Sequence, residues 1–324
     1  MLESAPPPLV TDGAPPATGE RLAPEQLRSL VAEDLTLLLR WRHADAQSHP
    51  PVDSALVERE DARVRSTYAD LLASGAHVYR CMASVSFLHA RLPRLPSYNE
   101  LRAQVAASAG TITVADVGCA FGQDTRELLL MGVLPHNCLA IDVTSAYWDF
   151  GRSVFGDAGD GTAAHSISQC QTSFADWALP AAADEEDDVV HPYRHSRDVV
   201  VCLFVLHVLS REQTTHMLGR LAQLAKPGGL LIGACVGCSA GLTGGPWGVI
   251  PGGQSTTPRW LHSPASLDTE LQRCGWTQKI DVRQYDRDTV GSLSGHPTGA
   301  TSSLDPGMGK QSYLAFTART SSQG

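Results

Sequence analysis

The stretch Val114-Ala-Asp-Val-Gly-Cys-Ala-Phe-Gly-Gln-Asp124 decides the fold class of this 324-residue chain. A short run suited to a β-strand leads into Gly118 and Gly122, and a helical pattern follows. Glycine lets the backbone turn tightly and approach a ligand closely. The dinucleotide fingerprint Gly-x-Gly-x-x-Gly does not fit, because the run reads Asp-x-Gly-x-Ala-x-Gly. We therefore predict a strand, a turn that binds a cofactor other than a dinucleotide, and a helix.

Beyond residue 110, short β-branched runs alternate with helical segments of roughly 10 to 15 residues, which is typical of βαβ units. The expected strands are 113–117, 138–142, 165–170, 198–203 and 230–236, with helices near 124–131, 146–155 and 211–225. Segments 277–285 and 312–318 are expected to close the sheet as an antiparallel pair. The predicted fold class is α/β: a Rossmann-like seven-stranded, mostly parallel sheet with an antiparallel last strand. Ligands of such sheets bind beyond the carboxyl ends of the strands.

The chain divides into three expected parts. Residues 1–20 are rich in Pro, Ala and Gly and predict a disordered tail. Residues 21–109 carry apolar residues at helical spacing and predict a helical N-terminal cap, with helices near 24–42, 57–74, 76–91 and 98–107. Residues 110–320 form the expected Rossmann-like domain. Within it, the Gly-rich stretch 237–253 is either a loop that closes over substrate or simple disorder.

Composition and charge limit the classes of function. Hydrophobic residues make up 43% and charged residues 18% of the chain, which excludes a wholly disordered protein. The formal net charge of −9 opposes binding to a phosphate backbone, so we expect no nucleic-acid partner. No apolar stretch approaches the roughly 20 residues of a membrane span, and the N-terminus lacks a basic start and an apolar run. A cytoplasmic location without a membrane partner is expected.

The eight cysteines are scattered and mostly lie within apolar runs, which predicts buried packing residues in a reducing compartment. Cys235 and Cys238 have the spacing of half a zinc ribbon, but no second Cys-x-x-Cys pair completes four ligands. We expect neither a disulfide nor a metal site.

Two later segments add to the signal of the glycine turn. The second expected strand ends at Asp142, where a carboxylate can accept hydrogen bonds from the hydroxyls of an unphosphorylated ribose. Further on, Lys226-Pro-Gly-Gly forms a turn from a helix into an apolar strand. The three segments in this order resemble the class I S-adenosylmethionine-dependent methyltransferases, with Ala120 in place of the middle glycine of their Asp-x-Gly-x-Gly-x-Gly loop.

A narrower resemblance joins 116–124 to Asp142-Val-Thr-Ser-Ala-Tyr-Trp148-Asp-Phe-Gly151 and to Phe204-Val-Leu-His207-Val-Leu-Ser210-Arg-Glu-Gln213. This set looks like the small-molecule methyltransferases of fungal meroterpenoid pathways. Segments 78–98 and 260–276 are similar to the same family, so the resemblance spans residues 76–318.

The resemblance implies S-adenosylmethionine as cofactor. The family usually has an acid just before Phe174 that binds the adenine amine; here Asp176 or a backbone group is expected to serve instead. The side chains and backbone expected to bind the cofactor belong to Asp116, Gly118, Ala120, Phe121, Gly122, Gln123, Asp142, Val143, Trp148, Asp176 and Phe204. For Trp148, the alternative is that it only packs its helix against the sheet.

The implied reaction is methyl transfer to a small, largely apolar molecule, at an oxygen. Tyr79, Phe87 and Tyr98 of the cap are expected to line the acceptor pocket, or else to be plain packing residues. His207 follows the fourth strand on the ligand side of the sheet and is the candidate base, although apolar neighbours also suit a packing role. No Asn/Asp-Pro-Pro-aromatic motif follows that strand, which disfavours nucleobase amines as acceptors.

Two other functions stay open at this point. A non-catalytic protein that binds or responds to S-adenosylmethionine would keep the fold, and Ala120 together with the missing adenine acid supports it. A nicotinamide-dependent oxidoreductase would require a different interpretation of the glycine turn.

Overall fold

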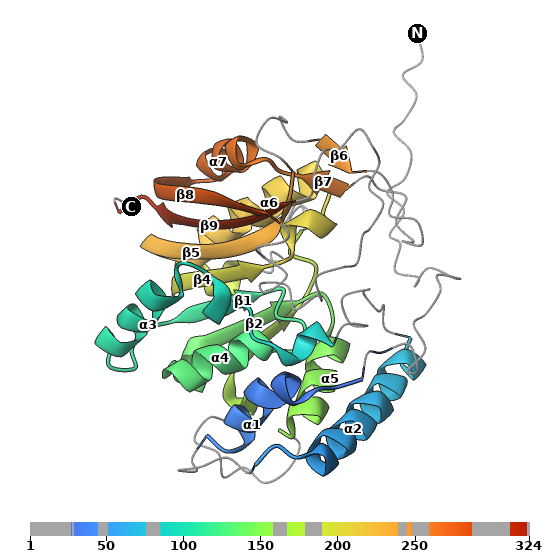
Figure 1. Cartoon of the computed structure of the whole chain (residues 1–324). Helices are drawn as coiled ribbons and strands as arrows, with labels where there is room; N and C mark the ends of the chain where they lie inside the picture. The colour runs from blue at the N-terminus through green and yellow to red at the C-terminus, as the bar shows by residue number, and fades with distance from the viewer. Residues whose placement is uncertain are drawn as a thin grey trace.

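The computed structural model describes residues 27, 29–44, 51–75, 85–157, 167–178, 190–238, 245–247, 259–286 and 312–322. Within them, seven strands form one sheet in the order β3-β2-β1-β4-β5-β9-β8 (Figure 1). The predicted tail at 1–20, Tyr79 and most of the 237–253 stretch lie outside the described residues.

Five strands pair in parallel with one another, and β9 and β8 complete the sheet. The parallel strands are β1 (Val114–Val117), β2 (Cys138–Asp142), β3 (Gln171–Phe174), β4 (Arg197–Leu203) and β5 (Ala225–Gly237). β9 (Ser312–Thr320) lies antiparallel between β5 and β8 (Trp276–Asp286). A separate sheet pairs β6 (Gly245–Trp247) with β7 (Arg259–Leu261). The predicted seven-stranded, mostly parallel sheet with an antiparallel last strand is confirmed.

The third strand differs from its prediction. It was expected at 165–170 and is found at Gln171–Phe174, directly after a 3-10 turn, Ile167–Gln169. Ile167 is buried, whereas most of β3 is exposed because it is an edge strand. The apolar signal that suggested a strand therefore belongs to the turn before it.

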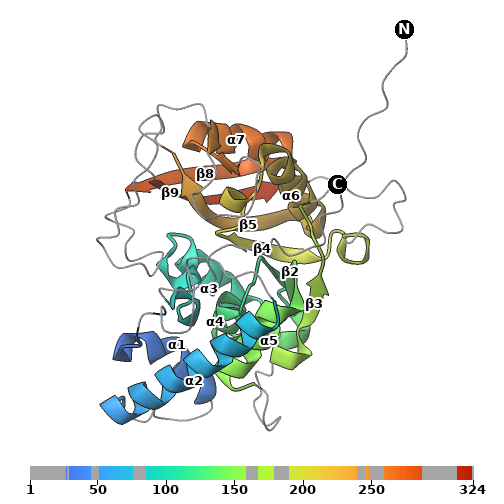
Figure 2. The same ribbon diagram turned by 90° about the vertical axis from the view of Figure 1, so that its right-hand side faces the viewer.

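Helices cover both faces of the sheet. One face carries α4 (Gln123–Met131) and α5 (Ser145–Phe155), and the other carries α6 (Arg211–Leu224) and α7 (Pro264–Arg273), as Figures 1 and 2 show. Alternate residues of β4 supply the two cores: Val199 and Val201 face the α4–α5 side, and Val200 and Cys202 face the α6–α7 side. All four are fully buried, so the apolar run of this strand reflects a sheet that is covered on both faces.

The cap consists of α1 (Thr36–Arg42), α2 (Ser54–Ala73), α3 (Tyr98–Ala107) and short 3-10 turns. In Figure 2, α1 and α2 lie beside α4 and α5, and residues of the cap share one apolar cluster with that face of the sheet. The expected boundary between the cap and the Rossmann-like domain, at residues 109 and 110, stays a prediction. The two parts share one hydrophobic core.

One predicted cap helix is wrong where the structure describes it. The segment 76–91 was expected to be helical, but Val85 has a left-handed backbone with φ 50° and the residues after it form a 3-10 turn, Ser86–Leu88. A β-branched residue in this conformation cannot continue an α-helix. Among the described residues of this segment, Val85, Phe87 and Leu88 are buried although they do not form an α-helix.

The topology fixes where a ligand site can form. β1 lies between β2 and β4, with Val117 level with Ile141 on one side and Cys202 on the other. The strand order reverses between β1 and β4, and ligands of open α/β sheets bind at the carboxyl ends of the strands at such a point.

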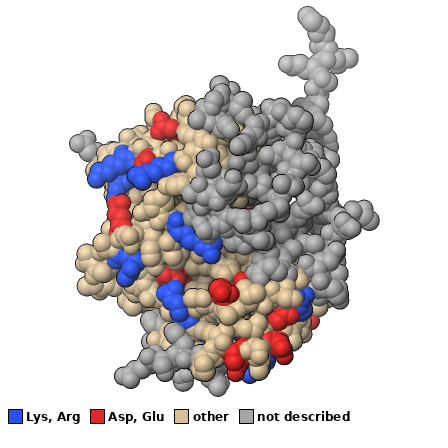
Figure 3. All heavy atoms as spheres, viewed as in Figure 1, with Lys and Arg blue, Asp and Glu red and all other residues tan. Residues whose placement is uncertain are grey.

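The described part of the chain contains no helix with the length and apolar character needed to cross a bilayer. On the face shown in Figure 3, basic and acidic side chains occur together over much of the described surface.

Candidate cofactor and active site

The turn from β1 to α4 is built from left-handed residues. Gly118, Ala120 and Gly122 have φ values of 73°, 47° and 71°. The backbone N–H groups of Gly118 and Cys119 donate to the carbonyl oxygen of Ile141, at 2.8 and 3.0 Å, which fixes the turn to the end of β2. Ala120 adopts the conformation that glycine would take at lower cost, since a Cβ strains a left-handed residue by about 1–2 kcal/mol.

The two glycines are needed for space inside the protein as well as for backbone conformation. A Cβ at Gly118 would lie 2.1 Å from Cγ2 of Val205, in the loop after β4. A Cβ at Gly122 would lie 2.9 Å from atoms of Arg126 and Trp148. At these two Cα atoms the chain packs closely against itself, and the predicted binding of a cofactor by Gly118 and Gly122 stays a prediction.

Asp142 joins the end of β2 to the glycine turn. Its Oδ2 accepts from the backbone N–H of Ala120 and its Oδ1 from that of Val143, both at 2.8 Å. Burial raises the pKa of this carboxyl, and the backbone hydrogen bonds oppose the shift. The residue is only half-buried, and a carboxylate has about four lone-pair sites, so Asp142 can accept further hydroxyl groups. The structure thus brings together two segments that the sequence analysis paired.

Exposed apolar side chains flank Asp142. Val143 and Phe174 are 54% and 36% exposed, at the carboxyl ends of neighbouring strands. Phe174 lies level with Asp142 in the β2–β3 pairing. Large exposed hydrophobic groups that lie beside a polar anchor suit an aromatic ligand. Phe174 was missing from the predicted site, although its segment had been noted.

Asp176 has a local partner. It is exposed, and its Oδ1 accepts from the backbone N–H of Ala178 at 2.9 Å, which closes a turn just after β3. Its proposed adenine contact stays a prediction.

Two further carboxylates lie buried beneath the turn. Oδ2 of Asp116 accepts from the hydroxyl of Thr125 at 2.6 Å. Oδ1 of Asp124 accepts from the backbone N–H groups of Arg91 and Leu92, at 2.6 and 2.8 Å. Burial, followed by the charge of Asp124, raises the pKa of Asp116 to about 7, and burial also raises the pKa of Asp124. Asp124 therefore ties the cap to the first turn of α4, a role that the sequence analysis missed.

Several predicted site residues pack in the core. Phe121 contacts Phe87 and Phe150 edge-on, with ring centroids 5.2 and 4.8 Å apart, and all three rings are buried. Trp148 is 5% exposed and packs on Gly122, and Gln123 is also buried. These contacts give Phe87 and Trp148 the packing roles that were their alternatives, and their ligand contacts stay predictions.

Tyr98 links two helices. Its hydroxyl donates to Oε1 of Glu127 at 2.5 Å, and Arg40 pairs with the other oxygen of that carboxylate at 2.9 Å. Burial, followed by the hydrogen bond to Glu127, raises the pKa of Tyr98 to about 12. The hydroxyl is thus occupied between α3 and α4, while a contact of its ring with an acceptor stays a prediction.

The end of β4 gathers residues from distant parts of the chain. Phe204 is left-handed, with φ 60°, and its N–H donates to the carbonyl of Ala234 at 2.6 Å. Its ring meets His207 and Tyr313 edge-on, with centroids 6.2 and 5.8 Å apart. The guanidinium of Arg91 lies over the same ring, 4.8 Å from the centroid. Neither Arg91 nor Tyr313 stood out in the sequence, since nothing in a linear pattern indicates which residues of a cap or a last strand meet Phe204.

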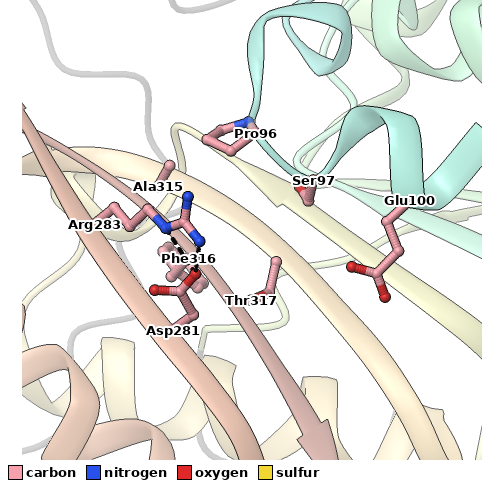
Figure 4. Close-up of a pocket in the computed structure, with 8 residues that line it drawn as sticks. All are labelled: Pro96, Ser97, Glu100, Asp281, Arg283, Ala315, Phe316 and Thr317. Atoms are coloured by element: carbon pink, nitrogen blue, oxygen red, sulfur yellow. Dashed lines mark hydrogen bonds and ion pairs between the residues drawn. The ribbon is translucent and has the colours of Figure 1, made fainter.

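One cavity lies apart from this site. A cavity of about 110 Å³ between α3, β8 and β9, shown in Figure 4, contains none of the predicted residues. Among the described residues, no group of three or more His, Cys, Asp or Glu side chains is arranged to hold a metal ion.

Comparison with known proteins finds fungal methyltransferases. The chain is 24% identical over 220 residues to the O-methyltransferase phiE of Fungal sp. (strain ATCC 74256), covering 66% of this chain and 69% of that protein. It is 25% identical over 243 residues to the O-methyltransferase atr3 of Stereocaulon alpinum, covering 72% and 65%. It is 26% identical over 164 residues to the methyltransferase ausD of Aspergillus calidoustus, covering 49% and 53%. This chain is similar in sequence to fungal methyltransferases. No family model matches it.

Solved structures similar to this chain include two bacterial methyltransferases. One is the 1,6-didemethyltoxoflavin-N1-methyltransferase of Burkholderia thailandensis, with a TM-score of 0.44, 16% identity, and 86% of this chain and 97% of that chain covered. Another is an S-adenosylmethionine-dependent methyltransferase of Mesorhizobium loti, with a TM-score of 0.43, 17% identity and coverage of 70% and 99%. The Rossmann-like methyltransferase fold of this chain is assigned from its own strand order, in which an antiparallel strand is inserted before the last edge strand.

The resemblance drawn from the sequence to fungal methyltransferases is confirmed by these relatives. The aligned regions span between about half and two thirds of the first relatives' length, at 69%, 65% and 53%.

Proposed function

We propose that this chain transfers a methyl group from S-adenosylmethionine to an oxygen of a small, largely apolar molecule. Two of the relatives are named O-methyltransferases, and all eight are named methyltransferases. The observation that carries the proposal is the hydrogen bond between the Asp142 carboxylate and the Ala120 amide. It joins the ends of β1 and β2 at the point where a nucleoside with a free ribose diol would bind.

The residues at this edge fit the donor. Asp142 would accept the ribose hydroxyls through its remaining lone pairs. Val143 and Phe174 would enclose the adenine, because both are exposed beside Asp142. The methionine end would then extend from the glycine turn toward Phe204. When bound, S-adenosylmethionine supplies an electrophilic methyl group.

The task of the protein is to align the acceptor and to exclude water. Alignment of two reactants can lower a barrier by about 7–11 kcal/mol. His207 is half-buried in the 3-10 turn Leu206–Val208, beside the ring of Phe204. It would take the proton of a hydroxyl acceptor, whereas a carboxylate acceptor would need no base. Tyr79, Phe87 and Tyr98 remain proposed acceptor contacts, and the packing of Phe87 and the Tyr98–Glu127 hydrogen bond support structural roles for two of them.

The donor assignment is tested by calorimetric titration with S-adenosylmethionine. Asp142→Asn keeps the size of the side chain and removes its charge and one acceptor, so we expect affinity to fall by about tenfold or more. Asp149→Asn is the matched control, because Asp149 is exposed on the neighbouring helix α5. Equal affinity of Asp142→Asn and the native chain would remove the ribose assignment.

The acceptor is tested by incubating the native chain with methyl-labelled donor and a metabolite extract. We expect a labelled product that partitions into organic solvent. A label released by mild alkali identifies a methyl ester. A label that resists alkali excludes an ester, and mass spectrometry of that product then distinguishes an ether from N-, S- or C-methylation. Donor binding without a labelled product under any condition would favour the non-catalytic alternative.

A further inference from the structure

Arg91 is held in place by its backbone while its side chain extends to another element. Its N–H donates to Asp124 at 2.6 Å, next to the parallel bond from Leu92. This contact sets the distance between the cap segment and the first turn of α4. The guanidinium then lies over the ring of Phe204, 4.8 Å from the centroid. Arg91 therefore bridges the cap and the carboxyl end of β4.

The Arg91 guanidinium has one buried donor without an acceptor among the described residues. Nε of Arg91 is buried and has no hydrogen-bond partner among the described residues. The positive charge of Arg91 lowers the pKa values of Asp116 and Asp124. The larger effect of burial raises them. Neither carboxylate forms an ion pair within 4.0 Å of it in the described part of the chain. A buried arginine donor without an acceptor is costly, so a group that enters from outside would stabilise it.

The position of Arg91 relative to the glycine turn narrows what that group can be. Phe204 supports the guanidinium, and the next residue, Val205, packs directly against Gly118. The guanidinium over Phe204 therefore lies at the end of β4, next to the strand β1 that leads into the glycine turn. A guanidinium stacked on an aromatic ring presents its N–H groups edgewise, in the geometry that matches a planar carboxylate.

We infer that Arg91 binds a carboxylate in this region, either the amino-acid carboxylate of the methyl donor or a carboxylate of the acceptor. This inference rests on the proposed function. With the donor, Arg91 would hold the end of the molecule opposite to the ribose that Asp142 holds. With the acceptor, Arg91 would orient a carboxyl group toward the methyl carbon.

The test compares ligands that differ only in the amino-acid part. S-adenosylhomocysteine carries the carboxylate, and 5′-methylthioadenosine keeps the adenosine without it. For Arg91→Met we expect affinity for S-adenosylhomocysteine to fall about 10- to 100-fold, with affinity for 5′-methylthioadenosine unchanged. Arg91→Lys keeps the positive charge without the planar guanidinium. Its affinity for S-adenosylhomocysteine should lie between that of Arg91→Met and that of the native chain. Arg102→Met is the matched control, because Arg102 is an exposed arginine whose guanidinium also lies over a ring, that of Tyr98, at 5.9 Å.

The outcomes separate the two sources of carboxylate and the two proposals. Unchanged affinity for both nucleosides, with a raised KM for the acceptor and an unchanged kcat, assigns the acceptor carboxylate. Equal loss for both nucleosides, or no change in nucleoside affinity and acceptor KM, overturns the inference. If the native chain binds neither nucleoside, the proposed function itself fails. Thermal unfolding of each variant shows whether it is folded. If Arg91→Met is not folded, the comparison is made with Arg91→Lys instead.

Discussion

The proposed donor side of the site, at the turn after β1, and the end of β4, which leads to the proposed acceptor side, are built from different kinds of segment. On the proposed donor side, β1 and β2 are adjacent strands, and the N–H groups of Gly118 and Ala120 join their ends by donating to the carbonyl oxygen of Ile141 and to the carboxylate of Asp142. At the end of β4, where the proposed donor and acceptor would meet, Arg91, Phe204 and Tyr313 come from the cap, the middle and the last strand of the chain, and they contact one another through side chains. Backbone hydrogen bonds between neighbouring strands make the first arrangement rigid. The second depends on how the cap packs.

The largest expected effect comes from filling the glycine turn. Gly118→Ala adds a Cβ to a left-handed residue and forces it against Val205. We expect a loss of about 2–5 kcal/mol in the free energy of unfolding, from backbone strain and overpacking together. Urea unfolding measures it. Gly219→Ala is the matched control: it lies inside α6 with no atom within 4 Å of a new Cβ, and we expect it to be stabilising by about 0.5–1 kcal/mol. Equal midpoints for Gly118→Ala and the native chain would contradict a rigid donor side.

The buried carboxyl of Asp116, in β1 before the glycine turn, should make the stability of the protein depend on pH. The pKa of Asp116 is raised to about 7 in the folded chain from an ordinary value of 3.8. The folded state therefore binds more protons than the unfolded state between these values. Its stability should fall as pH rises from about 4 to about 7, by at most about 1.4 kcal/mol per pH unit from this group.

Asp116→Asn should reduce that slope and keep an acceptor for Thr125. Urea unfolding of both proteins at a series of pH values measures the difference. Asp149→Asn, on the exposed side of α5, should keep the native slope. Parallel curves for Asp116→Asn and the native chain would show that Asp116 does not titrate in this range.

Tyr98 tests whether α3 belongs to the acceptor side. Tyr98→Phe removes the hydrogen bond to Glu127, and we expect a loss of about 1 kcal/mol in stability with the acceptor KM unchanged. Thermal unfolding and label-transfer kinetics measure the two effects. A raised KM with unchanged stability would place Tyr98 in the acceptor pocket and reverse its structural assignment.

The smallest expected effect is at Ala120. Ala120→Gly removes the strain of a left-handed alanine and adds entropy to the unfolded chain, so stability should rise by no more than about 1 kcal/mol. Affinity for S-adenosylhomocysteine should stay the same, because Ala120 contacts Asp142 through its backbone. Calorimetric titration and urea unfolding check both. A large change in affinity would mean that the methyl group of Ala120 contacts the donor.

The difference between the two sides also explains what the sequence could predict. Gly118, Gly122 and Asp142 follow strands that pair with one another, so the pattern of strands and turns was enough to place them at one edge. Asp124 was visible in the same motif, but its partners Arg91 and Leu92 precede it by more than 30 residues in an irregular segment. The helix expected at 76–91 shows the same limit, because the apolar spacing gave no sign of the left-handed Val85. Contacts between side chains from distant segments depend on tertiary packing, which the local hydrophobic periodicity of a sequence does not indicate.

The double grip of Asp124 on Arg91 and Leu92 has a consequence for motion. The same helical turn that follows the donor loop holds two successive amides of the cap. To swing this segment outward, the molecule must give up both bonds and leave a buried carboxylate without its donors. Movement of this cap segment would therefore break its contacts with the helix that follows the proposed donor loop.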